Sequence, residues 1–186
     1  VTPDDLEAGT PPGAWRRERR QRKGDRLFVD ILVAISGEPG GWAALNQALD
    51  VARREGGYLH GLYVVPDEDA RQDDETQAIR DEFNRRCHEA GVSGECIVDV
   101  GEVVPSIWEY GRWADLVVAS LLHPPEPRPL PKWGAGFRNL LYQASSPVLA
   151  VPGIGARPIN RTLLAYDGSP KADEALFIAR HLAERW

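Results

Sequence analysis

The chain has 186 residues, of which 42% are hydrophobic and 27% charged, and its net charge is −6. These values are ordinary for a soluble globular protein, and no apolar run approaches the ~18–20 residues of a membrane-spanning helix. The two cysteines, Cys87 and Cys96, are too few for a disulfide framework and lack metal-ligand spacing, which favours a reducing, cytoplasmic setting.

Residues 1–27 do not resemble part of a folded core. Acidic residues and a Pro-Pro-Gly turn precede a basic run at 16–23, and we interpret the whole segment as an arm or linker. The alternatives are an arm that binds nucleic acid or anionic lipid, or a position next to a membrane span. The chain contains no methionine and begins with Val1, so we expect it to be a piece of a larger protein.

Strand and helix patterns alternate from residue 29 to residue 151. Continuous apolar runs or strand-forming segments predict five strands, at 31–35, 58–65, 95–100, 116–119 and 148–151. Apolar residues at helical spacing predict four helices between them, with faces at 44–52, 79–90, 103–111 and 137–144. This alternation predicts an α/β fold, a doubly wound five-stranded parallel sheet with helices on both faces. Ligands of such sheets bind outside the carboxyl ends of the strands.

The opening of this unit is repeated near the end of the chain at a constant offset of 131 residues. Eight positions between 32 and 52 are identical to their counterparts between 163 and 183, without gaps. We interpret residues 161–186 as the first strand–helix unit of a second, truncated domain, joined through a linker at 153–160. The alternative is a single extra strand–helix unit that completes the first sheet.

These motifs, in this order, resemble the universal stress protein family. The resemblance rests on 31–52, Gly101 before an amphipathic helix, Ala-Asp-Leu-Val-Val at 114–118 and Ser-Pro-Val-Leu-Ala-Val-Pro at 146–152. Tyr-Asp-Gly-Ser at 166–169 fits the family in the second unit. The resemblance implies a complete domain at 28–152 and a tandem arrangement with the second domain at 161–186.

The family resemblance also implies a test for ATP binding, which the first unit fails at most points. Members that bind ATP have a strand-one aspartate and a Gly-x2-Gly-x9-Gly-(Ser/Thr) loop, whose backbone N–H groups cradle phosphates. Here Ser36 replaces the aspartate, Ser120 and His123 replace two glycines, and Ala135 replaces the hydroxyl residue after Gly134. Five prolines fill the ten-residue insert between His123 and Gly134, and proline offers no N–H.

The altered ATP-binding loop bears on three candidate functions. We favour a non-enzymatic regulatory or adaptor domain with a degenerate ATP-binding motif and no required cofactor. It would act as a homodimer or by pairing with a second domain of its kind through strand 148–151, an apolar edge. The alternative is a sensor for ATP or another adenine nucleotide, which would form the cytoplasmic regulatory part of a larger transporter or signalling protein. Its nucleotide crevice would be lined by Ala34, Ile35, Ser36, Val65, Ala119, Ser120, Gly134 and Ala135. An ATP hydrolase lacks an identifiable base or metal ligand.

Other chemistry-bearing residues favour structural roles. We expect His60 to be a hydrogen-bonded strand histidine, Cys87 and Cys96 to be small core residues, and Trp108 and Trp113 to pack. His123 and Trp133 are the candidates for a ligand contact in the proline-rich loop. No metal site is expected, and nucleic acid is an improbable partner.

Overall fold

The computed structural model describes residues 24, 26–121, 141, 144–152 and 158–186. The basic run at 16–23, the proline-rich loop and most of the expected helix at 137–144 lie outside these residues. The described elements are β1 (Asp30–Ile35), α2 (Pro39–Glu55), β2 (Tyr58–Val65), η2 (Ala70–Gln72), α3 (Asp74–Ala90), β3 (Gly94–Val100), α4 (Val103–Gly111), β4 (Leu116–Ser120), β5 (Val148–Val151) and α6 (Pro170–Arg185).

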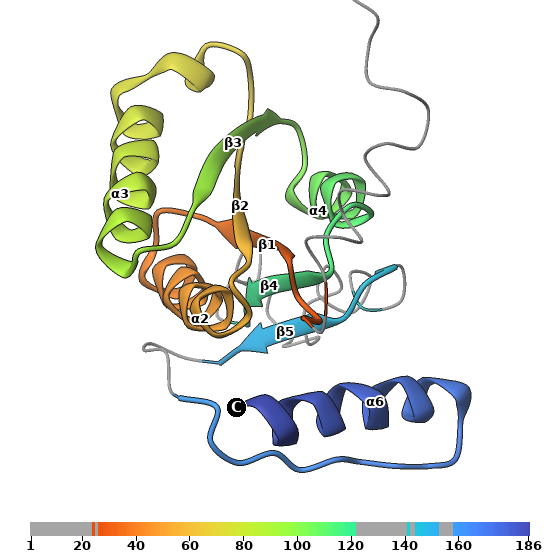
Figure 1. Ribbon diagram of the computed structural model, residues 1–186. Helices are drawn as coiled ribbons and strands as arrows, with labels where there is room; N and C mark the ends of the chain where they lie inside the picture. The colour runs from red at the N-terminus through yellow and green to blue at the C-terminus, as the bar shows by residue number, and fades with distance from the viewer. Residues whose placement is uncertain (1–23, 25, 122–140, 142–143, 153–157) are drawn as a thin grey trace, which may run out of the picture.

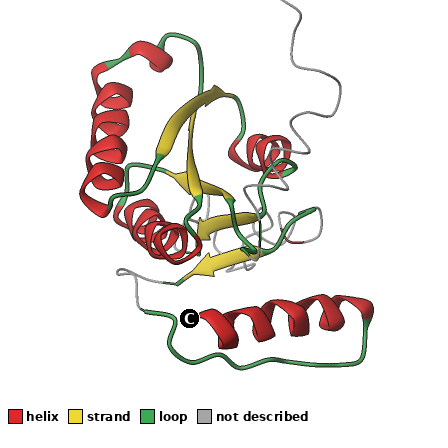
Figure 2. Cartoon of the chain, viewed as in Figure 1, coloured by secondary structure: helices red, strands yellow, loops and turns green. Residues whose placement is uncertain are grey.

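The five strands form one parallel sheet in the order β3-β2-β1-β4-β5. Helices α2 and α3 cover one face and α4 lies against the other (Figure 1; Figure 2 separates helices from strands by colour). The predicted doubly wound α/β fold is therefore confirmed, and the predicted strand bounds at 58–65 and 148–151 agree with the structure. In the described part of the chain, no helix is long and apolar enough to cross a membrane.

Local sequence signals explain where the helices begin and end. Helix α2 starts with Pro39 at its first turn, where a missing N–H costs nothing, and ends at Gly56 in the left-handed conformation. Helix α3 begins where the Asp73 carboxylate accepts the Thr76 N–H at 2.7 Å, and it ends at the left-handed Gly91. These caps fix both helix lengths, and so place the apolar stripes over the sheet.

The core divides into two clusters, one on each face of the sheet. On the α2 and α3 side it includes Ile31, Leu45 and Phe83, all fully buried. Gly61 in β2 lies directly beneath Phe83, because a Cβ atom there would overlap the phenyl ring. On the α4 side Leu32, Leu62 and Ile107 form a smaller cluster. Cys87 belongs to the first cluster, as expected, while Trp113 is 62% exposed beyond the end of α4, so the expectation that it packs is wrong.

The repeated segment at the end of the chain forms a helix without its expected strand. Residues 158–169 make no strand pairing in the described structure, and Leu163 is 98% exposed. The sheet therefore gains no sixth strand from this segment. Helix α6 lies beside β5 (Figure 1), and the indole nitrogen of Trp186 donates to the buried Glu55 at the end of α2, 2.9 Å away. The assignment of 161–186 to a second domain stays a prediction.

His60 lies in β2 between carboxylates from both neighbouring strands, which confirms a hydrogen-bonded strand histidine. Its Nδ1 is 3.0 Å from Glu95 Oε1 on β3, and its Nε2 is 3.8 Å from Asp30 Oδ1 on β1. The interaction with Asp30, and then that with Glu95, raises the pKa of His60 against the opposing effect of burial. The His60 side chain therefore links three strands at the amino end of the sheet.

This arrangement predicts a specific pH dependence of stability. A histidine pKa raised on folding stabilises the native state fully below its unfolded value of about 6.5, and this contribution is lost as pH rises through the folded pKa. The substitution His60→Gln should therefore lower the free energy of unfolding more at about pH 5.5 than at about pH 9. Urea titrations at both pH values measure this difference. His88→Gln, on the exposed side of α3, is the control, and an equal cost of His60→Gln at both pH values would contradict the prediction.

Candidate functional site

The carboxyl ends of β1 and β4 meet at the switch point of the sheet. Strand β1 pairs with β2 on one edge and β4 on the other, with Val33 opposite Val118. The structure therefore brings six of the eight predicted crevice residues to one edge of the sheet: Ala34, Ile35, Ser36, Val65, Ala119 and Ser120. Gly134 and Ala135, like His123 and Trp133, lie outside the described residues.

These six residues do not share one surface. Ala34 and Ala119 pack into the α4-side cluster, whereas Ile35 belongs to the opposite cluster under α2. Ile35, Val65 and Ala119 are buried, with exposed fractions of 5%, 2% and 6%. The alternation of side chains along a strand causes this division. Only Ala34, Ser36 and Ser120 retain partial exposure at the edge, so the polar part of the crevice consists of two hydroxyl groups.

Side chains of α2 and α3 pack around the loop between β1 and α2. The indole N–H of Trp42 donates to the Gly37 carbonyl at 2.9 Å, and Gly37 adopts a φ of 72°. The Arg86 guanidinium of α3 lies 4.8 Å from the centre of the Trp42 ring. A Cβ atom at Gly41 would lie 2.7 Å from both the nitrogen and Oγ of Ser36, so the first turn of α2 packs directly on Ser36. A ligand at Ser36 would therefore meet a rigid, already packed loop.

Backbone groups at the other strand ends are also engaged within the protein. The carbonyl of Val65 accepts the Gly101 N–H at 3.0 Å, and the Leu121 N–H donates to the Val151 carbonyl at 2.9 Å. Phosphate binding by main chain needs free N–H groups directed at the ligand. At the described strand ends, the N–H groups of Gly101 and Leu121 donate within the protein instead.

The described segments that directly follow the strand ends carry no positive charge for a polyphosphate. Residues 36–38, 66–69, 101–102 and 121, which follow the described strand ends, include no lysine or arginine. Acidic residues follow β2 directly at 67–69, and more lie at 73–75 before and at the start of α3. Within the described residues, no group of three or more histidine, cysteine or acidic side chains could hold a metal ion. Burial raises the pKa of both Cys87 and Cys96 to about 11, which keeps both thiols protonated and poorly nucleophilic at neutral pH.

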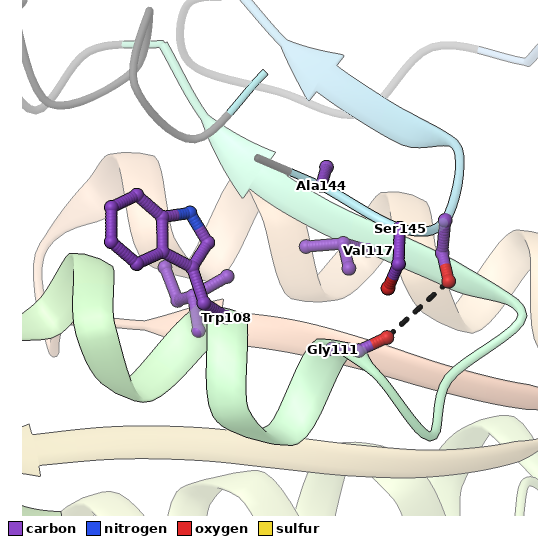
Figure 3. Close-up of a pocket in the computed structure, with 7 residues that line it drawn as sticks. Trp108, Gly111, Val117, Ala144 and Ser145 are labelled. Atoms are coloured by element: carbon purple, nitrogen blue, oxygen red, sulfur yellow. Dashed lines mark hydrogen bonds between the residues drawn. The ribbon is translucent and has the colours of Figure 1, made fainter. Parts of the chain in front are cut away.

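A small hollow lies away from this edge, on the α4 face of the sheet. Figure 3 shows the Trp108 indole on one side and Ala144 and Ser145 on the other, with Val117 at the base. The Ser146 hydroxyl lies 3.3 Å from the Gly111 carbonyl and donates to the Ala114 carbonyl at 2.7 Å. The Trp108 indole nitrogen is buried and has no hydrogen-bond partner within the described structure. A second, shallow depression is lined by Asp50, Arg53 and Arg54 on α2. Neither hollow coincides with the predicted crevice.

The Asp-Gly-Ser motif of the second unit forms the start of α6. The Ser169 hydroxyl accepts the Ala172 N–H at 3.2 Å, and Asp167 Oδ1 accepts the Ser169 N–H at 2.9 Å. Hydrogen bonds from the Ser169 side chain and backbone hold the pKa of Asp167 below its usual value. Within the described residues this motif therefore acts as a helix cap.

Comparisons with known proteins place the fold. No protein-family model matches the chain, and no curated protein sequence does. Among solved structures, the universal stress protein UspA from Lactobacillus plantarum matches with a TM-score of 0.57 at 20% identity, over 68% of this chain and 98% of its own. A universal stress protein in complex with cAMP matches with a TM-score of 0.57 at 21% identity, over 67% and 97%.

A universal stress protein family member from Arabidopsis thaliana with AMP bound also matches. Its TM-score is 0.51 at 18% identity, over 67% of this chain and 91% of its own. These likenesses cover nearly the whole of each neighbour, and they share the five-stranded parallel α/β sheet seen here. The described domain therefore has the universal stress protein fold, as the sequence motifs predicted.

The packing around the β1–α2 loop predicts unequal effects of two matched substitutions. Trp42→Phe removes the hydrogen bond to Gly37 and weakens the stacking with Arg86, so it should lower the free energy of unfolding by about 1–2 kcal/mol. Trp108→Phe removes a similar volume from a half-buried indole, but it deletes an N–H that has no partner among the described residues, so its cost should be smaller. Urea unfolding of both variants measures the difference. Equal or reversed costs would show that the bond to Gly37 contributes no net stability.

Proposed function

We propose that this domain is a non-enzymatic regulatory or adaptor module that acts by pairing with a second domain of the same fold through β5. The outer edge of β5, with which no described strand pairs, is the observation that carries this proposal. The chemistry of the predicted crevice supports this proposal. Its described strand ends carry two hydroxyl groups and are followed by acidic residues, and several of their backbone groups are already hydrogen-bonded within the protein. Turnover of a nucleotide would need a base, a metal ligand or a phosphate cradle there.

The hydrogen-bond register defines which atoms of β5 are available. Val117 donates to the Pro147 carbonyl at 3.0 Å, and Leu121 donates to the Val151 carbonyl at 2.9 Å. Odd-numbered residues of this strand therefore bond to β4, and the N–H and C=O groups of Val148 and Ala150 point away from it. No further strand pairs with β5 in the described structure. An edge of this kind is a template for another strand.

The register predicts a substitution that removes pairing without unfolding the sheet. Ala150→Pro deletes an outward N–H and leaves the bonds to β4 intact, and proline is tolerated at such edge positions. We expect this variant to lose self-association over a concentration series in sedimentation equilibrium while retaining its circular dichroism spectrum. Ala150→Val keeps the donor and should associate like the parent. Unchanged association of Ala150→Pro would exclude pairing through β5.

An adenine-nucleotide sensor is the second candidate function. The cAMP and AMP complexes of structurally similar proteins favour it, because six predicted crevice residues lie at the corresponding kind of strand edge here. The altered residues argue for weak binding at most. This candidate does not require catalysis and is compatible with domain pairing.

A thermal-shift titration separates the two candidates. A ligand that binds only the native state stabilises it by RT ln(1 + [L]/Kd), or about 2.7 kcal/mol at one hundred times Kd. We expect ATP–Mg and cAMP at millimolar concentration to leave the melting temperature unchanged. A saturable rise that is reduced by Ser36→Leu, which fills the crevice, would favour the sensor over the adaptor.

A further inference from the structure

Glu55 is a fully buried carboxylate shared by the two ends of the described chain. Its Oε2 accepts the Leu27 N–H at 2.8 Å, with the Phe28 N–H at 3.5 Å. Its Oε1 lies 2.8 Å from Nε2 of His181 and 2.9 Å from Nε1 of Trp186, both in the last residues of the chain. An ionised carboxylate can only accept, so both ring nitrogens are donors. One oxygen therefore holds the start of β1 and the other holds α6.

The buried charge is compensated by these donors. Burial alone would raise the pKa of Glu55, but the hydrogen bonds from His181, Trp186 and Leu27 outweigh it and hold the pKa below its usual value. If α6 left, Oε1 would lose both of its ring donors and would need water in their place. Docking of α6 and compensation of the Glu55 charge by hydrogen-bond donors are thus coupled.

The remaining contacts of α6 are few and lie mostly toward its end. Ile178, Leu182 and Trp186 recur every fourth residue and pack against the α2-side core. The Arg54 guanidinium lies 5.0 Å from the centre of the Trp186 ring. In the preceding turn, Leu176 and Phe177 remain 48% and 65% exposed. A helix held by one apolar stripe and one carboxylate is suited to reversible release.

Helix α6 lies along the outer side of the sheet, next to β5 (Figure 1). Leu149 and Val151 of β5 belong to the same apolar cluster as Ile178 and Leu182 of α6. A strand that joined β5 would have to lie about 4.8 Å away, whereas a helix with its side chains is about 10 Å across. Figure 1 shows α6 on the side of β5 that faces away from β4, which is the side that a pairing strand would take.

We propose that α6 is a built-in cover of the β5 edge, latched by Glu55, and that its release admits a second copy of this chain. The inference rests on the proposed pairing through β5, and it adds the element that limits that pairing. Release exposes the outward backbone of Val148 and Ala150, and the incoming strand of the second copy replaces α6 as the cover.

The test removes the latch while keeping the start of β1 in place. His181→Ala combined with Trp186→Ala deletes both donors to Oε1, and the bond from Leu27 to Oε2 remains. Loss of two hydrogen bonds to a charged acceptor should weaken docking by roughly tenfold or more. Hydrogen exchange of residues 178–185 reports release, and sedimentation equilibrium reports the dimer dissociation constant. This constant should fall by up to the square of that factor, because both copies must release α6. His181→Ala alone is the milder variant if the double variant folds poorly.

Two further variants make the outcomes distinct. Arg180→Ala removes only an exposed ion pair with Glu184 on the same helix, and it should change neither exchange nor association. Adding Ala150→Pro to the double variant should abolish the gain in association while α6 stays released.

Each failure has its own signature. If the parent chain dimerises in a manner that Ala150→Pro abolishes, and release leaves the dissociation constant unchanged, the cover is refuted and the pairing function stands. Undiminished protection of 178–185 in the double variant refutes the latch. If α6 is released and no variant associates, the pairing function fails and the cover fails with it.

Discussion

The central position of β1 determines the rest of this structure. Ile31, Leu32 and Val33 are at most 1% exposed, because the strand is bonded on both edges and covered on both faces. Parallel neighbours on both sides can be reached only through crossover connections, so helices must lie on each face. The same geometry creates the switch point between β1 and β4. The location of the candidate crevice therefore follows from the burial of one short apolar run.

Three helices contribute to the apolar cluster on the α2 side of the sheet. Helix α2 contacts β1, β2, β4 and β5, and α3 lies over β3. Helix α6 of the repeated segment adds Ile178, Leu182 and Trp186 to the margin of this cluster. The repeat thus contributes to the first domain through its helix alone. Its exposed apolar residues, Leu163 among them, occupy positions whose counterparts in the first unit, such as Leu32, are buried.

Periodicity predicted most of the fold because each strand and helix carries its own apolar pattern. Such local patterns predicted two strands, at 58–65 and 148–151, and the helix that contains Phe83 and Cys87. The strand expected ahead of the Asp-Gly-Ser motif at 167–169 did not form, and residues 158–169 pair with none of the described strands. Of the predicted crevice, the strand ends were placed together correctly, but the prediction overlooked the alternation of side chains, which puts Ala34 and Ile35 on opposite faces. Contacts such as that between His60 and Asp30 depend on the register between strands, which no local pattern encodes.

The junction at Glu55 was the least predictable feature, and the repeat explains its form. Residue 55 corresponds to residue 186 at the offset of 131, and these two equivalent positions touch each other. A glutamate at the end of α2 is opposed by the helix dipole and by its burial, so it persists only with strong donors. The equivalent position carries an indole whose N–H is such a donor, and His181 supplies a second one turn earlier. At positions related by this offset, the chain thus carries an acceptor, Glu55, and a donor, Trp186. The contact between α2 and α6 requires the two positions to differ, because two ionised glutamates could not share this buried position.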